Sequence, residues 1–209
     1  MAEAHSTIAR VPNLLLVTDR QAAGGRDLVD VVTAALDAGL PAVQLRDKDL
    51  PGRALFALAE RLRAATMRTG AMFFVNDRVD VACAVGADGV QLGATSLPVA
   101  VARDLLPAGT VIGYSAHAFD EVRTTTADCI LFGPVFDTPS KRAHGSPQGL
   151  PRLRDAVAAA RVPVLAIGGV EAAHLPVIRA TGAHGVAVIR AILAAPDPAA
   201  ATRMLLAAH

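Results

Sequence analysis

Residues 162–190 read VPVLAIGGVEAAHLPVIRATGAHGVAVIR and contain two short apolar runs separated by a longer segment. The runs over 162–169 and 184–190 are almost continuously apolar, which is typical of strands buried on both faces of a parallel sheet. The segment between them ends near Gly182, and helices commonly end at a glycine. This stretch therefore predicts a strand, a helix and a second strand.

Six earlier runs have the same character, and Ala/Leu/Arg-rich segments with helical spacing separate most of them. The runs cover residues 13–19, 41–47, 72–77, 88–93, 110–116 and 128–134, and clear helical segments cover 26–39, 50–70 and 149–161. Eight strand–helix repeats that close on themselves form a (β/α)8 TIM barrel. An open, doubly wound sheet is the alternative, but no GxGxxG turn follows the first run. We expect a single-domain α/β chain, a (β/α)8 TIM barrel over residues 1–209 with a flexible N-terminal arm over residues 1–12.

The composition narrows the class of protein. Hydrophobic residues make up 53% of the 209 residues and aromatic residues only 3%, so we expect a core of Ala, Val, Leu and Ile. Lys and Arg are scattered and the net charge is +1, which favours neither a nucleic acid nor an acidic membrane as a partner. No apolar stretch reaches the length of a membrane span, and the N-terminal segment lacks a signal-peptide core. We therefore expect a cytoplasmic protein.

The two cysteines, Cys83 and Cys129, offer neither a disulfide framework nor a zinc-binding spacing. Both stand among apolar residues in the sequence. We expect two buried free thiols in a reducing compartment.

Polar residues gather where the predicted strands end, and in such a barrel the C-terminal ends of the strands carry the chemistry. Gln44, Arg46 and Lys48 alternate with other residues, so their side chains turn the same way, toward the barrel mouth. A buried cation without a counter-charge is costly, so Arg46 and Lys48 indicate an anionic ligand. An internal ion pair with Asp47, Asp49 or Asp77 is the alternative.

Asn76 and Asp77 end the third run and offer a carbonyl oxygen and a carboxylate. These ligands suit a magnesium ion that keeps several waters and takes its other ligands from phosphate. An N-cap for the helix that follows is the alternative, because Asn and Asp are common at that position.

Two segments that follow later strand-like runs have the composition of phosphate-binding loops. Gly168 and Gly169 would let a ligand approach the backbone at the usual phosphate site of these barrels, although a tight turn also explains them. The stretch over 132–150 has neither strand nor helix period and supplies Thr138, Ser140 and Lys141, two hydroxyls and an ammonium suited to a diphosphate. Its glycines and prolines suggest a lid, and a solvated surface loop is the alternative.

Seven short motifs occur in the order and spacing of the thiamin phosphate synthase and thiazole tautomerase (TenI) superfamily, which the chain resembles from about Leu14 to Ile192. The motifs are VQLRDK, VNDRVDVA, DGVQLG, GYSAH, FGPVFDTPSK, PVLAIGG and GVAVI. The resemblance implies a (β/α)8 barrel enzyme of thiamin biosynthesis. It implies a transferase that joins hydroxymethylpyrimidine diphosphate to thiazole phosphate and releases pyrophosphate.

The resemblance also implies roles for individual residues. Those expected to cradle the diphosphate are Gln44, Arg46, Lys48, Asn76, Thr138, Ser140 and Lys141. Asp77 is expected to bind Mg2+, and the rest of the substrate site is expected to comprise Ser115, Gly168, Gly169, Val188 and Ile189. Arg46, Lys141 and His117 are the expected catalytic residues. The expected partners are phosphorylated small molecules, with a homodimer left open.

Two positions depart from the synthase pattern. Ser96 stands where the synthase has a second magnesium-binding aspartate, and Arg190 replaces the usual serine after the last strand. The alternative activity is that of the tautomerase branch, which needs no metal and uses a histidine at the position of His117. Gln44 and Asp77, for which a tautomerase has little use, favour the synthase. A structural role for His117, and a phosphate-ligand sensor without turnover, are further alternatives.

Overall fold

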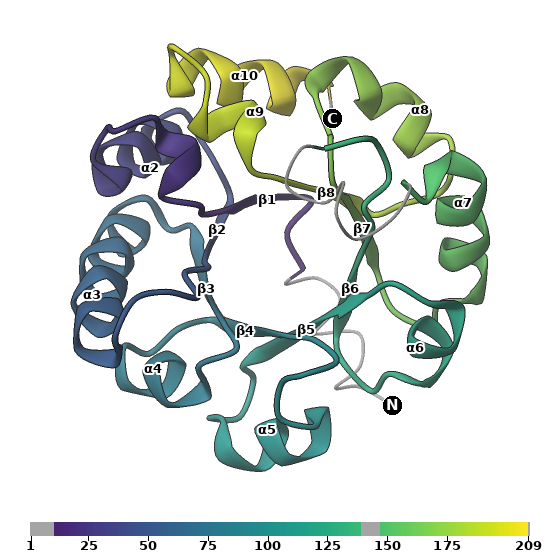
Figure 1. Cartoon of the computed structure of the whole chain (residues 1–209), viewed down its shortest axis with the longest axis horizontal. Helices are drawn as coiled ribbons and strands as arrows, with labels where there is room; N and C mark the ends of the chain where they lie inside the picture. The colour runs from purple at the N-terminus through teal and green to yellow at the C-terminus, as the bar shows by residue number, and fades with distance from the viewer. Residues whose placement is uncertain (1–10, 139–146, 209) are drawn as a thin grey trace.

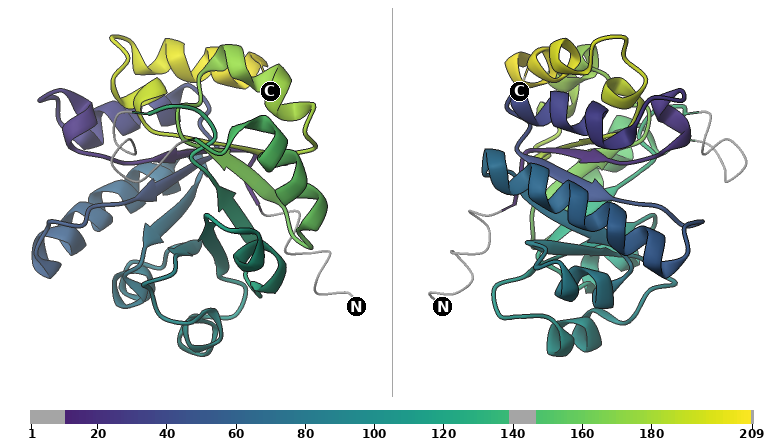
Figure 2. Two further views of the ribbon diagram at one scale, coloured as in Figure 1. Left: turned by 45° about the vertical axis from the view of Figure 1, so that its right-hand side comes forward. Right: turned by 90° about the vertical axis from the view of Figure 1, so that its left-hand side faces the viewer.

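The computed structural model describes residues 11–138 and 147–208, so the predicted site residues Ser140 and Lys141 lie outside the described part of the chain. Eight parallel strands close into one barrel in chain order, with helices around it (Figures 1 and 2). The strands are β1 (Leu14–Val17), β2 (Ala42–Leu45), β3 (Met72–Asn76), β4 (Gly89–Leu92), β5 (Val111–Ala116), β6 (Cys129–Phe132), β7 (Val164–Ile167) and β8 (Gly185–Val188). Because β1 pairs with both β2 and β8, the barrel is confirmed and the open sheet is excluded.

Helical segments connect the strands and cover the outside of the barrel (Figure 1). They are η1 (Gln21–Ala23), α2 (Leu28–Asp37), α3 (Gly52–Thr69), α4 (Val79–Ala84), α5 (Val99–Leu105), α6 (Phe119–Thr124), α7 (Gly149–Ala159), η3 (Ala172–His174), α8 (Leu175–Arg179), α9 (Arg190–Leu193) and α10 (Pro198–Ala208). The helical segments predicted over 26–39, 50–70 and 149–161 are confirmed as α2, α3 and α7. Within residues 11–138 and 147–208, no helix combines the length and the apolarity that a membrane crossing requires.

Side chains along each strand alternate between the barrel interior and the layer beneath the helices. Val17, Ala42 and Phe74 belong to an inner apolar cluster, whereas Val43 belongs to the outer one. Phe74 fills the interior because Gly89 on the adjacent strand leaves room for it: a Cβ at Gly89 would lie 2.2 Å from the Phe74 ring. The interior is thus a packed core, and ligands must bind at its mouth.

Two expectations about individual residues are wrong. Cys129 is buried, and burial together with the charge of Asp128 raises the pKa of its thiol to about 12, but Cys83 is exposed. Cys83 lies on the solvent side of α4, a short helix whose apolar neighbours in sequence do not all face the barrel. Val11, expected in a flexible arm, is buried against the inner cluster, and His184 Nε2 lies 3.0 Å from its carbonyl oxygen.

Candidate active site

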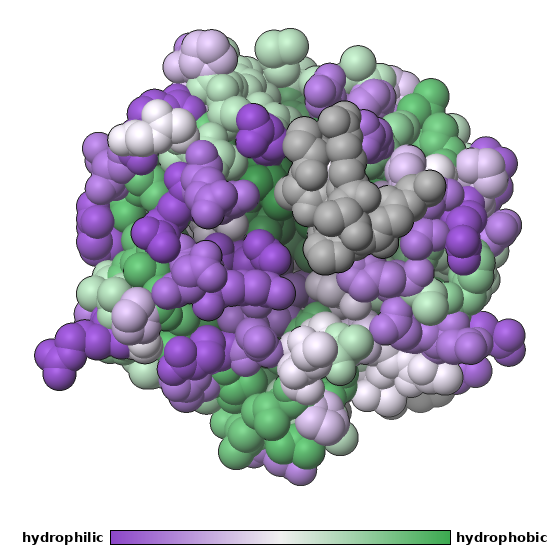
Figure 3. Space-filling view, in the orientation of Figure 1, coloured by the Kyte–Doolittle hydropathy of each residue, from purple (hydrophilic) through white to green (hydrophobic). Residues whose placement is uncertain are grey.

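The polar residues predicted to form a site follow the C-terminal ends of strands in a closed parallel barrel, so they share one rim. Figure 3 shows hydrophilic residues gathered on this face, beside the mouth and over the ends of β2, β3 and β4. The sequence predicted this convergence from the strand order alone, and the structure confirms it for the described residues.

Gln44 is a buried polar residue of the barrel interior. It lies on β2 two positions after Ala42, which belongs to the inner cluster, so the period of the strand turns both side chains inward. The side chain of Gln44 is only 1% exposed, and its Nε2 has no hydrogen-bond partner among the described residues. Since buried amide groups are almost always paired, this nitrogen is available to donate to an oxygen of a ligand or of an ordered water.

Arg46 follows β2 at the rim, and Thr18, the residue after β1, holds its backbone. The hydroxyl of Thr18, a fully buried residue, accepts a hydrogen bond from the Arg46 N–H (2.9 Å) and donates one to the Arg46 carbonyl (3.3 Å). Across residues 11–138 and 147–208, no carboxylate forms an ion pair with Arg46 or Lys48. The alternative, an internal ion pair of these two cations with a nearby aspartate, is therefore not observed in this part of the chain.

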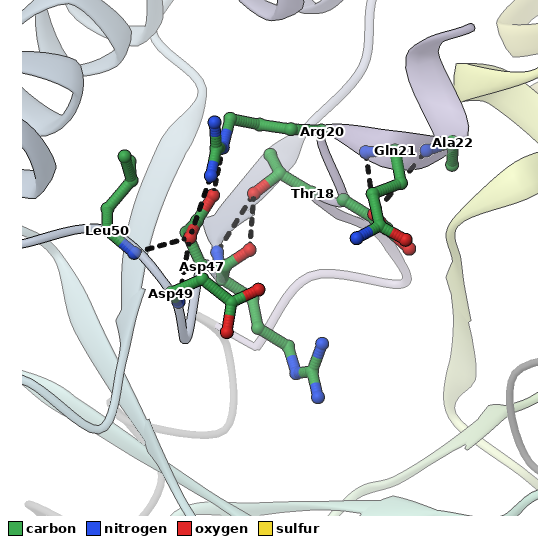
Figure 4. Close-up of polar contacts among 9 residues, drawn as sticks. Thr18, Arg20, Gln21, Ala22, Asp47, Asp49 and Leu50 are labelled. Carbon is green, nitrogen blue, oxygen red and sulfur yellow. Dashed lines mark hydrogen bonds and ion pairs between the residues drawn. The ribbon is translucent and has the colours of Figure 1, made fainter.

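Asp47, the alternative partner of Arg46, pairs with Arg20 instead (Figure 4). Its carboxylate also accepts hydrogen bonds from the N–H groups of Asp49 (3.1 Å) and Leu50 (3.0 Å). Burial acts to raise the pKa of Asp47, but the hydrogen bonds from Arg20 and from these two N–H groups outweigh it and hold the pKa below its usual value. Asp47 is thereby kept charged and committed to the β2–α3 turn, which leaves Arg46 available.

Gln91 and Ser115 meet at the ends of β4 and β5. Gln91 is 2% exposed, and its side-chain amide lies 3.0 Å from the Ser115 hydroxyl. The structure thus brings the predicted residue Ser115 to the rim together with Gln91, which sequence analysis left out of the predicted binding set. Its signal was the same as that of Gln44: a glutamine within a strand that is otherwise apolar.

Asp77 is the one residue other than glycine with a positive φ in the described part of the chain (φ 68°). Such a backbone costs free energy and is found where the surrounding structure enforces it, often at functional sites. The Asp77 N–H donates to the Gln91 carbonyl (2.9 Å). The N-cap of α4 is Arg78, without a side-chain capping bond, so the alternative role of Asn76 and Asp77 as caps is not observed.

Ser96, at the position of the missing carboxylate, forms a local turn. Its hydroxyl accepts a hydrogen bond from the Gly93 N–H at 2.8 Å. The described residues contain no cluster of three or more His, Cys, Asp or Glu side chains able to hold a metal ion. A cation here would need ligands from the substrate.

His117 follows β5, and its ring is oriented by the protein. Its Nδ1 lies 2.7 Å from the carbonyl oxygen of Gly133, which can only accept, so Nδ1 carries the proton in this contact and a neutral ring keeps Nε2 as an acceptor. The backbone N–H groups of His117 and Ala118 donate to the side chain of Glu121 (2.7 and 2.9 Å), in the first turn of α6. The residue as a whole is exposed to solvent.

The segment after β6 packs on the glycines after β7. The N–H of Phe136 donates to the Gly168 carbonyl at 3.0 Å, and a Cβ at Gly168 would lie 2.5 Å from the Cβ of Pro134. A Cβ at Gly169 would lie 2.5 Å from the carbonyl oxygen of Asp137. Both glycines are therefore required by this contact between two loops, a constraint that sequence analysis missed.

The remaining predicted residues lie beside this contact. Thr138 is half-buried at the end of the described segment, and Val188 is buried at the end of β8. Ile189 precedes α9, whose first residue is Arg190. Arg190 borders a surface hollow of about 400 Å3 that it shares with Gln21 and Arg26.

The chain matches known proteins over nearly its whole length. A family model described as thiamine monophosphate synthase matches residues 14–192. The chain belongs to this family. A putative thiamine-phosphate synthase of Geobacter sulfurreducens is 50% identical over 198 residues, which cover 93% of each chain. The resemblance inferred from the seven motifs is thereby confirmed.

Other members of the thiamine monophosphate synthase family agree in length and shape. A thiamine-phosphate synthase of Roseiflexus castenholzii is 44% identical over 193 residues, which cover 91% of this chain and 85% of its own. The solved structure of a thiamine phosphate pyrophosphorylase from Pyrococcus furiosus has a TM-score of 0.84 and 37% identity, covering 94% of both chains. The family thus keeps this barrel at modest sequence identity.

Proposed function

We propose that the protein joins hydroxymethylpyrimidine diphosphate to thiazole phosphate and forms thiamin phosphate and pyrophosphate. The observation that carries the proposal is the buried Gln44 amide, whose nitrogen lacks a partner in the described residues. It lies on the same side of β2 as Arg46, for which those residues provide no counter-charge. A diphosphate at the mouth would supply oxygens to both, and the names of the family and of its members support the same activity.

The proposed reaction breaks the bond between the pyrimidine methylene carbon and the diphosphate oxygen, which keeps the electron pair. The thiazole nitrogen forms a bond to that carbon, so no protein nucleophile is required. Catalysis then depends on positive charge that meets the charge growing on the leaving diphosphate, and on alignment of the two rings. We assign the charge to Arg46, Lys48 and Lys141, with neutral hydrogen bonds from Gln44, Asn76, Ser115, Thr138 and Ser140. We assign the thiazole phosphate to Gly168, Gly169, Val188 and Ile189.

The residues of this site suit a Mg2+ ion that binds together with the phosphorylated substrate. Asp77 offers a carboxylate and Asn76 an amide oxygen, and Mg2+ is commonly held by one or two carboxylates together with substrate phosphates. We propose that these residues hold a Mg2+ ion that balances the charge of the diphosphate. The donor set fits only with phosphate oxygens included.

The activity is tested by incubating the purified protein with both substrates, with and without Mg2+, and measuring thiamin phosphate by fluorescence after conversion to thiochrome. We expect product only when both substrates are present, and more of it with Mg2+. A preparation that is folded by circular dichroism and forms no product at micromolar enzyme would refute the proposal.

Ser96→Asp is expected to lower the Mg2+ concentration that gives half-maximal activity, because a carboxylate is a stronger Mg2+ ligand than a hydroxyl. The measurement is a Mg2+ titration of the initial rate. Thr95→Asp, at the exposed neighbouring position, adds the same charge as a matched control. Equal titration midpoints for S96D and the unchanged protein would argue against a metal ligand at this position.

The orientation of His117 supports a second candidate activity, aromatisation of the carboxylated thiazole phosphate by proton transfer. In the tautomer whose Nδ1 donates to the Gly133 carbonyl, Nε2 is a proton acceptor. If the protein has this activity, His117→Ala and His117→Asn should each abolish it. Removal of metal ions from the unchanged protein should leave the rate of aromatisation as it was. Aromatisation that survives in either variant would end the idea.

A further inference from the structure

Phe136 and His174 form an aromatic contact that the proposed reaction does not use. Phe136 lies in the segment after β6, and His174 is the last residue of η3, after β7. Their ring centroids are 4.1 Å apart, with 18° between the ring planes. Since β6 and β7 are adjacent in the barrel, the stack joins two neighbouring connections at the mouth.

Backbone contacts hold the same two connections together. The N–H of Val135 donates to the Ile167 carbonyl at 2.9 Å, as that of Phe136 does to Gly168. Figure 1 shows the segment after β6 crossing the end of β7 toward β8. The Phe136 ring is half-buried and packs on the outer apolar core, so its position constrains the residues that follow it.

Thr138 follows Phe136 by two residues and belongs to the proposed diphosphate site. The stack with His174 and the backbone bonds of Val135 and Phe136 to Ile167 and Gly168 fix the chain up to two residues before Thr138. A shift of the Phe136 ring would therefore also move the backbone that leads to Thr138. An error of about 1 Å at a substrate contact can cost two orders of magnitude in rate.

We infer that His174 is a positioning residue: by stacking on Phe136 it sets where the segment after β6 presents Thr138 to the diphosphate. The inference rests on the proposed function, because Thr138 is assigned there. His174 has a second contact, since its Nδ1 accepts a hydrogen bond from the Glu171 N–H at 3.3 Å and closes η3. A test must separate the stack from this bond.

Two substitutions separate them. His174→Phe keeps a ring to stack and removes the acceptor, whereas His174→Gln removes the ring and keeps an acceptor of the kind found in capping boxes. We expect H174F to retain the KM for the pyrimidine diphosphate and H174Q to raise it about three- to tenfold, the range that the loss of an aromatic pair allows. The affinity for inorganic pyrophosphate, measured by titration calorimetry, should fall by a similar factor in H174Q alone.

A double-mutant cycle with Phe136→Leu checks that the effect passes through the stack. H174Q added to F136L should raise the KM no further, because the partner ring is already gone. Thermal unfolding of each variant controls for loss of fold. Normal KM and pyrophosphate affinity in H174Q, or impairment in H174F with a normal H174Q, would overturn the inference.

The proposed function fails in a different way. In that case neither the unchanged protein nor any variant at position 174 forms thiamin phosphate. If the unchanged protein turns over both substrates and binds pyrophosphate while H174Q matches it, only the positioning role falls.

Discussion

Arg46→Ala is expected to lower kcat by about 10²- to 10³-fold, or about 3–4 kcal/mol of transition-state stabilisation, the usual cost of removing a group that meets developing negative charge. Arg46 follows β2, and Thr18 holds its backbone. Asp47, the nearby carboxylate that could neutralise Arg46 in place of a diphosphate, is paired with Arg20. The charge of Arg46 is therefore available to the leaving diphosphate. The measurement is the steady-state rate of thiamin phosphate formation.

Two variants control for this result. Arg46→Lys keeps the charge but loses the forked guanidinium, so it should recover part of the rate. Arg161→Ala removes an exposed arginine that precedes β7, at the opposite end of the barrel, and should leave kcat unchanged. A near-normal kcat in R46A would show that Arg46 serves the fold rather than the reaction.

Gly169→Ala is expected to lower kcat/KM by about 10²-fold, because the new methyl group would displace the segment after β6. Its Cβ would lie 2.5 Å from the Asp137 carbonyl oxygen and 2.8 Å from the Phe136 Cβ. The new methyl group would meet the backbone of Asp137 and the first side-chain atom of Phe136, which cannot move aside as the end of a flexible side chain can. The segment after β6 must therefore shift, and Thr138 with it. Initial rates over a range of both substrates measure the change.

Gly86→Ala is the matched control for this substitution. Gly86 has nearly the same backbone conformation (φ 60° against 63°), but nothing lies within 4 Å of a Cβ built there. Both variants pay the cost of a positive φ, about 1 kcal/mol of unfolding free energy, which chemical denaturation can measure. Equal activity in G169A and G86A would show that the contact between the loops is dispensable.

The fold could be predicted closely from the sequence because each strand has a local signal, a short and nearly continuous apolar run. Near-continuous apolar runs such as 162–169 are required wherever a strand is buried on both faces, so their number and order predict the closed barrel. Parallel strands also place all C-terminal ends on one rim, so Gln44, Asn76 and Ser115 could be assigned to one site without coordinates. The family motifs then supplied the expected chemistry.

The errors have a common cause in packing around short elements. Cys83 stands among apolar residues and Val11 between Arg10 and Pro12, and the sequence did not reveal that Cys83 turns to solvent and that Val11 packs on the barrel interior. The role of Asn76 and Asp77 as caps was an equally open question, which the backbone geometry at Asp77 answered.

The sequence by itself determined the eight-stranded barrel and the rim that carries the polar residues, because these depend on strand period and chain order. Only the tertiary structure decided that Asp47 pairs with Arg20, that the Gln44 amide nitrogen has no partner within residues 11–138 and 147–208, and that Gly168 and Gly169 accommodate the segment after β6. Those features depend on contacts between residues far apart in the chain, whose distances no local pattern encodes.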